Sequence, residues 1–231
     1  MKKLIEMDNK QLYNFTREQT QVFLTARLGD GNIHHTKSNS WCYRSNCKYR
    51  EYLEFKKELI GKGKIVLCEK NGYSQTPIYE YYGGAYPNLK LIKEMNLKDI
   101  LNNLDDLGLA LWFYDDGSLH KNRLFYHLNT QKFSREEHEQ IIIPYFESLG
   151  IKGTLRVDKS KSTNPLYYIS IGKYDGAYEI STILSKYPMG CYSYKLWSSE
   201  TIQKWSKLQE KLKSTDKELN LIQLGQIWRY L

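Results

Sequence analysis

Two aspartates, Asp30 and Asp116, each stand directly before a glycine and shortly after an apolar run. The surrounding letters repeat, since Asp-Gly-Asn-Ile-His at residues 30–34 matches Asp-Gly-Ser-Leu-His 86 residues later. Two carboxylates brought to one place repel each other unless a cation lies between them. The pair therefore predicts a site for a divalent cation, provided that the fold brings the two acids together.

The apolar run before each acid is typical of a helix that positions it. Residues 109–114 read Leu-Ala-Leu-Trp-Phe-Tyr, and residues 19–29 predict the first such helix, with Thr20 as a candidate N-cap. A repeat of 86 residues is too long for a solenoid unit and fits a duplicated half-domain. If the halves pack helix against helix about a pseudo-twofold axis, the two aspartates emerge side by side.

The first half continues with strands and helices in alternation. Residues 49–60 predict an amphipathic helix with Tyr52, Phe55 and Leu59 on one face, ended by Gly61. We further expect two strands or a long hairpin within 32–48, strands at 64–67 and 78–82 around a turn at Asn71 and Gly72, a helix at 88–95 and a linker at 96–105.

The second half repeats this plan. Ser134 and Glu137 form a capping-box pattern that opens a helix running to Leu149, and Pro144 should kink it. We expect strands at 124–129, 155–157 and 167–171, a helix at 178–184 and a helical tail from residue 199.

The fold class is therefore α+β, with two pseudo-symmetric α-β-β-α-β-β-α repeats. The expected division is an N-terminal extension at 1–18, a first repeat at 19–104, a second repeat at 105–198 and a C-terminal tail at 199–231.

Composition narrows the class of partner. The chain has 231 residues, and its Lys and Arg outnumber its Asp and Glu by 34 to 26. This basic surplus favours a polyanion, although many basic proteins bind none. Residues 1–6 lack the apolar core of a signal peptide, and no window reaches the length of a membrane span. We expect a cytoplasmic, intracellular protein with no membrane partner.

Taken together, these residues resemble the LAGLIDADG homing endonucleases of the single-chain, two-repeat type, over residues 19–200. Residues 24–31, Leu-Thr-Ala-Arg-Leu-Gly-Asp-Gly, are a diverged copy of the motif. Residues 109–117 match the W-F-x-D-D-G variant of one branch, and residues 128–133 and 189–195 also resemble that branch. The resemblance implies a saddle of two antiparallel sheets, with the motif helices as the central interface and the concave face in the DNA major groove.

The resemblance also implies which residues hold the metal. Asp30 and Asp116 would bind a divalent cation beside the scissile phosphates, usually Mg²⁺, with Mn²⁺ or Ca²⁺ able to substitute in binding. The side chain of Asp115 does not match the ligand position. Its backbone carbonyl and that of Gly29 would complete the metal shell.

Such enzymes place a lysine near each site and a residue that positions water. Lys195 matches the second-half lysine, and Lys93 is the first-half candidate, with Lys90 and Lys98 as alternatives. Gln131 is the candidate for positioning a water.

Alternate strand residues would read base edges in the groove. His34 and His120 repeat, and we favour groove-facing or structural roles for them over a zinc or general-base role. The candidate DNA contacts are Asn32, His34, Lys37, Asn39, Arg44, Lys121, Arg123, Asn129, Arg156, Lys159, Lys161 and Lys173.

The favoured function is a sequence-specific double-strand DNA endonuclease encoded by a mobile intron. Its partner would be double-stranded DNA with a long recognition site, and the protein would act as a monomer. The alternative is a non-cleaving nucleic-acid binder on the same fold, either an RNA maturase for intron splicing or a regulator. Degenerate binders tend to lose a motif acid, so the presence of both acids favours the nuclease.

Overall fold

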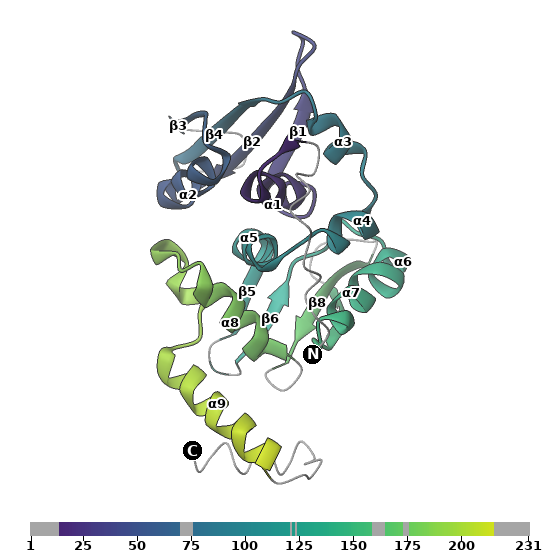
Figure 1. Cartoon of the computed structure of the whole chain (residues 1–231), viewed down its shortest axis with the longest axis vertical. Coiled ribbons are helices and arrows are strands. Elements are labelled where there is room, and N and C mark those ends of the chain that lie inside the picture. The colour runs from purple at the N-terminus through teal and green to yellow at the C-terminus, as the bar shows by residue number, and fades with distance from the viewer. Residues whose placement is uncertain are drawn as a thin grey trace.

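The computed structural model describes residues 14–69, 76–120, 122, 124–158, 165–172 and 176–214. Within these ranges, two four-stranded antiparallel sheets lie on either side of a central pair of helices (Figure 1). The predicted turn at Asn71 and Gly72 falls outside them. No helix among the described residues is long and apolar enough to cross a membrane.

The first half contains the predicted strands and helices with shifted bounds. The helix α2 ends at Gly61, which has a left-handed φ of 84°, as predicted for that position. Of the predicted face, Tyr52 is buried, and Phe55 and Leu59 are half-buried and pack against the core. The prediction missed Leu53, Lys56 and Ile60, which are fully buried on this helix. The elements are α1 (Arg17–Thr25), β1 (Gly31–His35), β2 (Trp41–Cys47), α2 (Arg50–Ile60), β3 (Lys64–Cys68), β4 (Ile78–Ala85) and α3 (Leu89–Glu94).

The first motif helix begins and ends earlier than predicted. Thr16, not Thr20, is the N-cap, and it forms a capping box with Gln19. Thr20 lies inside the first turn, where its hydroxyl donates to the Thr16 carbonyl at 2.8 Å. Because α1 ends at Thr25, a short turn separates the helix from Asp30.

The predicted linker at 96–105 contains a helix, α4 (Leu97–Asn102). Asn96 caps it by accepting a hydrogen bond from the backbone N–H of Asp99 at 2.9 Å. The linker prediction was wrong because this local cap, followed by buried Ile100 and Leu101, is enough to form a helix.

The second half repeats the order of the first. The capping box of Ser134 and Glu137 is confirmed, and the helix that it opens is interrupted by a π-helical segment just before Pro144, which lacks an N–H. Its elements are α5 (Asp106–Asp116), β5 (Gly117–His120), β6 (Phe125–Leu128), α6 (Arg135–Glu137), η2 (His138–Ile142), α7 (Ile143–Ser148), β7 (Gly153–Asp158), β8 (Leu166–Ile171), α8 (Tyr178–Lys186), η4 (Gly190–Lys195) and α9 (Ser199–Ser214).

The two sheets share one topology. Their strand orders are β1-β2-β4-β3 and β5-β6-β8-β7, which are the same order in the two halves. On the first sheet, Ile33, Tyr43 and Tyr81 are buried toward the helices. Asn32 and Arg44 pair across β1 and β2 and alternate with those buried positions, so they lie on the opposite face.

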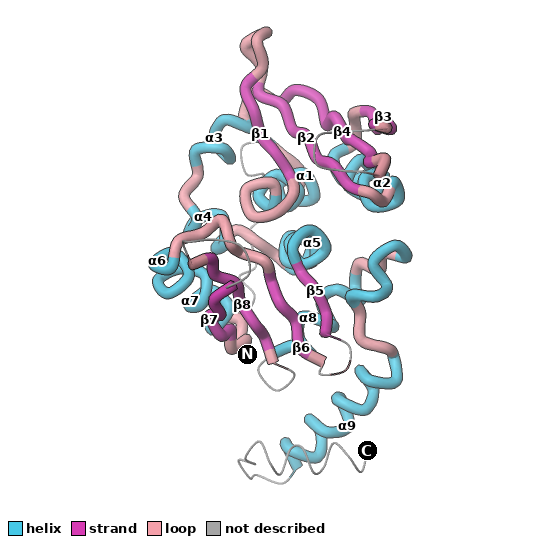
Figure 2. The backbone as a smooth tube through the Cα atoms, turned by 180° about the vertical axis from the view of Figure 1, so that it is seen from behind, coloured by secondary structure: helices cyan, strands magenta, loops and turns pink. Residues whose placement is uncertain are grey.

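The motif helices α1 and α5 pack against each other between the sheets, as both views show (Figures 1 and 2). Buried Gln21 of α1 donates to the carbonyl of Asn103 at 3.0 Å and accepts from the N–H of Asp105 at 3.1 Å. A Cβ on Gly108 would lie 2.2 Å from the Gln21 Oε1 atom. A side chain at this position would therefore displace the Gln21 amide, which accepts the hydrogen bond from the Asp105 N–H.

Candidate active site

The structure brings the ends of the two motifs together. Asp116 is the last residue of α5, and Asp30 lies between α1 and β1. The carboxylate of Asp115 accepts a hydrogen bond from the backbone N–H of Asp30 at 3.4 Å, so the two turns are in contact across the helix pair. Asp30 and Asp116 thus occupy the same end of the α1–α5 pair.

Both acids have pKa values raised by burial and by neighbouring carboxylates. Burial, then the charges of Asp115 and Asp30, raise the pKa of Asp116 to about 7, against the opposing fields of Lys132 and Lys195. Burial and Asp115 also raise the pKa of Asp30. Asp30 is exposed, so solvent screens its shift more strongly than that of Asp116.

A hard divalent cation would relieve this mutual repulsion. Mg²⁺ takes oxygen ligands and usually keeps several waters, binding through one or two carboxylates together with substrate phosphates. Among the described residues no three His, Cys, Asp or Glu side chains converge as a metal cluster. The carboxylates of Asp30 and Asp116 are oxygen donors of the kind that Mg²⁺ takes.

The side chain of Asp115 lies beside the two acids and is bound by residues of the first half. Its side chain is 1% exposed and pairs with Lys56 of α2, which is also 1% exposed, at 2.8 Å between Oδ1 and Nζ. The hydroxyl of Tyr52 donates to the same Oδ1 atom at 2.7 Å. The Asp115 side chain is thus committed to a buried ion pair, and the sequence analysis missed Lys56 as its partner.

Gly29 makes room for Asp115. A Cβ on Gly29 would lie 2.7 Å from both the Cβ and the Oδ2 atom of Asp115. We expect Gly29→Ala to lower the free energy of unfolding by about 1–3 kcal/mol, the usual cost of overpacking, in urea titrations. The same substitution should cost less in an Asp115→Ala background, which removes the clashing Oδ2 atom and keeps the Cβ atom. An equal cost in both backgrounds would contradict the predicted clash with the carboxylate.

Lys195 lies in η4 and is buried beside the end of α5. Its ammonium donates to the carbonyls of Tyr114 at 2.6 Å and Phe113 at 3.3 Å. Burial lowers the pKa of Lys195 to about 8, although the charges of Asp115 and Asp116 oppose this shift. Lys195 is therefore a cation held within the field of the paired acids.

The first-half lysine is less clearly placed. The backbone carbonyl of Lys93 accepts a short hydrogen bond from the Arg27 guanidinium. Lys90 is exposed and pairs with Glu94 at 3.7 Å, and Lys98 is exposed on α4. None of these observations assigns a catalytic role, so all three lysines stay predictions.

The turn after β6 adds a cation that the sequence analysis did not single out. Gln131 is half-buried there. The charge of its neighbour Lys132 partly offsets the rise in the pKa of Asp116 and of Asp30. Asn129, in the same turn, donates its backbone N–H to the Asp116 carbonyl at 3.0 Å. The signal for Lys132 was its place directly after Gln131, in a run already recognised as part of the resemblance.

The predicted DNA contacts divide into described and undescribed positions. Asn32, Lys37, Asn39, Asn129 and Arg156 are exposed, and Arg44 and His34 are partly exposed. The Nδ1 atom of His34 has no hydrogen-bond partner within the part of the chain that the structure describes. The others, Lys121, Arg123, Lys159, Lys161 and Lys173, lie outside the described residues.

A hollow of about 320 Å³ extends from Asp30 over the face of the first sheet that carries Asn32 and Arg44. Arg44 on its wall forms a short ion pair with Glu80, and its guanidinium carbon lies 4.9 Å from the centre of the Tyr82 ring. The residues that line the hollow are Asp30, Asn32, Arg44, Ser45, Asn46 and Glu80.

Comparisons of the sequence with known proteins match DNA endonucleases. A sequence profile of the LAGLIDADG DNA endonuclease family matches residues 26–177. The probable intron-encoded DNA endonuclease 3 of Mycosarcoma maydis is 36% identical over 69 residues, which are 30% of this chain and 51% of that protein. The match thus spans about half the length of this curated relative.

Solved structures are similar over most of the chain. The homing endonuclease I-WcaI, solved bound to its DNA recognition sequence, aligns with a TM-score of 0.65 at 20% identity, over 82% of this chain and 90% of that one. A structure of I-DmoI in complex with DNA and Mn aligns with a TM-score of 0.47 at 15% identity, over 74% of this chain and 98% of that one. The likeness to I-WcaI shows a shared fold.

Proposed function

Because this chain belongs to the LAGLIDADG DNA endonuclease family, we propose that it is a sequence-specific homing endonuclease that cuts both strands of DNA with a divalent metal. The observation that carries this proposal is the meeting of Asp30 and Asp116 at one end of the α1–α5 pair. The name of the Mycosarcoma maydis relative supports a mobile intron as the encoding element. The I-WcaI complex supports a double-stranded DNA recognition site as the partner.

In this proposal, residues of the chain position the cation and the attacking water, and they neutralise the negative charge that develops. Asp30 and Asp116 would hold the cation, Mg²⁺ or in its place Mn²⁺, and the backbone carbonyls of Gly29 and Asp115 are the further candidate ligands. When bound, such a cation supplies Lewis-acid stabilisation of charge at the scissile phosphate. Lys195 adds fixed positive charge where negative charge develops. Gln131 orients the attacking water.

One chain carries both acids, which supports action as a monomer on both strands. The proposal is tested by incubating the purified protein and Mg²⁺ with a randomised duplex library and with its host locus joined across the insertion point. We expect double-strand cuts at one long sequence. A protein that binds nucleic acid but never cuts either substrate would instead favour the maturase or regulator.

Arg44 is the described residue best fixed to read a base. Its guanidinium is held by Glu80 and lies 3.3 Å from the Tyr82 hydroxyl. Arginine donors fit the O6 and N7 atoms of guanine, and such a contact contributes about 1–3 kcal/mol of discrimination. We expect Arg44→Ala to relax a guanine preference at one base pair by about 10–100-fold, measured by selection from the library.

The matched control for this substitution is Arg50→Ala. Arg50 is an exposed arginine on α2 that pairs with Glu54 at 2.8 Å. Its loss should leave the base preferences unchanged. If Arg44→Ala instead weakens binding equally for every sequence, Arg44 contacts phosphate and not a base edge.

A further inference from the structure

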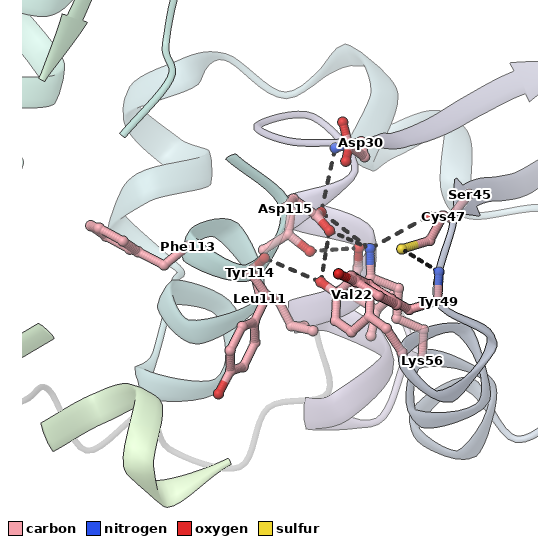
Figure 3. A network of polar contacts seen from close by, with 12 residues as sticks. Val22, Asp30, Ser45, Cys47, Tyr49, Lys56, Leu111, Phe113, Tyr114 and Asp115 are labelled. Atoms are coloured by element: carbon pink, nitrogen blue, oxygen red, sulfur yellow. Dashed lines mark hydrogen bonds and ion pairs between the residues drawn. The ribbon is translucent and has the colours of Figure 1, made fainter. Parts of the chain in front are cut away.

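One buried ion pair joins the second motif helix to the first half of the chain. Figure 3 shows the side chain of Asp115, on α5, between Lys56 of α2 and Asp30. The Lys56 ammonium lies 2.8 Å from Oδ1 and 3.1 Å from Oδ2 of Asp115. The two residues are 59 positions apart in the chain, so this pair forms only when both halves are folded and packed.

The pair is fully hydrogen-bonded. Lys56 also donates to the Ser45 hydroxyl at 3.4 Å and lies 4.4 Å from the centre of the Tyr52 ring. Burial alone would lower the pKa of Lys56, but the adjacent Asp115 carboxylate reverses this and raises the pKa above its ordinary value. The carboxylate of Asp115 and the hydroxyl of Ser45 thus accept hydrogen bonds from the Lys56 ammonium inside the protein, in place of water.

Stability alone does not explain such a pair. Replacing a buried ion pair by apolar residues of similar volume is often neutral or stabilising, because two charges have lost their water. The pair also has no counterpart at the equivalent positions of the repeat among the described residues. The position of the first motif that matches Asp115 is Gly29, and α2 corresponds to a stretch that buries Ile142 and Phe146. This difference between the halves indicates that the pair has a specific role at the end of the α1–α5 pair where Asp30 and Asp116 lie.

The location of Asp115 indicates that task. Its backbone is joined directly to Asp116, and its Oδ2 atom accepts the backbone N–H of Asp30. Asp115 is therefore linked to both acids. A peptide bond joins it to Asp116, and its side chain is hydrogen-bonded to the turn that carries Asp30. Lys56 and Tyr52 fix that side chain from the first half.

We propose that Asp115, locked by Lys56, is the positioning residue that sets the spacing of Asp30 and Asp116. This inference rests on the proposed function, since the spacing matters for holding one cation between two carboxylates. Neither Asp115 nor Lys56 needs to contact DNA or the cation through its side chain. Residues that orient ligands in this way typically change metal affinity or activity by about 10–100-fold when they are replaced.

The test uses the double variant Lys56→Met/Asp115→Leu in the full chain. It removes both charges together, so no buried charge is left unpaired and folding should be retained. Lys57→Met is the matched control, because Lys57 is the neighbouring exposed lysine on the same helix. Tyr52→Phe is the milder second variant, since it keeps the buried ring and removes the hydroxyl, with its 2.7 Å hydrogen bond to Asp115 and its longer 3.3 Å contact with the Leu111 carbonyl.

Two measurements separate positioning from general stability. Amide exchange by NMR reports the Asp30 N–H in the free protein, without metal or DNA. Mn²⁺ binding to the complex with the selected duplex, followed by electron paramagnetic resonance, reports the paired acids. We expect the double variant to exchange the Asp30 amide faster and to bind Mn²⁺ about 10–100-fold more weakly at unchanged DNA affinity. Tyr52→Phe should show smaller changes of the same sign, and Lys57→Met none.

Unchanged amide exchange and unchanged Mn²⁺ affinity in the double variant and in Tyr52→Phe would overturn the inference. If the double variant does not fold, Tyr52→Phe decides the question by the same two readings. If the wild-type protein binds and cuts no DNA, the proposed function fails, and amide exchange alone then decides whether Asp115 fixes the Asp30 turn.

Discussion

Asp30→Asn and Asp116→Asn should each abolish DNA cutting while leaving DNA binding nearly intact. Each substitution keeps the shape of the side chain and removes one negative charge from the end of the α1–α5 pair. A bound metal contributes several kcal/mol to such a reaction, so the cutting rate should fall by about 10³-fold or more. The rates are measured on a saturating concentration of the selected duplex with Mg²⁺, and binding is measured with Ca²⁺ by gel shift.

The control for this prediction is Asp106→Asn. Asp106 is an aspartate of the same helix at its opposite end, where it forms a short ion pair with Lys186. It should cut DNA at the wild-type rate. Full activity in either the Asp30 or the Asp116 variant would refute the assignment of the two acids.

Lys195→Met should slow cutting by about 10²–10³-fold, the usual cost of removing one preorganised donor from a developing negative charge. The protein should still bind the duplex, because the Lys195 ammonium is directed at the carbonyls of Phe113 and Tyr114 and is buried. The Met side chain can occupy much of the same space. Cutting and binding are therefore measured in parallel on the same preparation.

The pH dependence gives this prediction a second reading. Below its folded pKa of about 8, Lys195 is charged and contributes to cutting, and its contribution is lost as the pH rises through that value. Since the unfolded pKa is about 10.4, the unfolded chain binds more protons than the folded one between these values. Stability from this group therefore rises with pH across that window, while activity falls. A wild-type and a Lys195→Met profile of the same shape above pH 8 would contradict the assignment.

The sequence was sufficient to predict the elements that place the acids. The duplicated runs around Asp30 and Asp116 are local helix–turn–strand patterns, and the structure has both at matching places. The shared strand order of the two sheets follows from the same repeat. These features were predictable because spacing, apolar pattern and turn residues act over a few neighbouring positions.

The missed features depend on contacts between distant segments. A lysine on a helix is normally assigned to the polar face, so the predicted apolar face of α2 contains Tyr52, Phe55 and Leu59 and omits Lys56. Lys56 is tolerated inside only because Asp115 arrives from the other half of the chain. Likewise, no pattern near Asp115 indicates that its side chain is bound by residues of the first half. The assignment of Thr20 as N-cap failed for a local reason, since the Thr16 to Gln19 capping box was overlooked.

The proposed function depends on one cation that is shared by the carboxylates of Asp30 and Asp116. The most direct test is a crystal structure of the protein with its selected duplex and Mn²⁺, read by anomalous difference density. We expect a peak between the two carboxylates, next to the scissile phosphates. Manganese density bound elsewhere, with the two carboxylates apart and unligated, would contradict it.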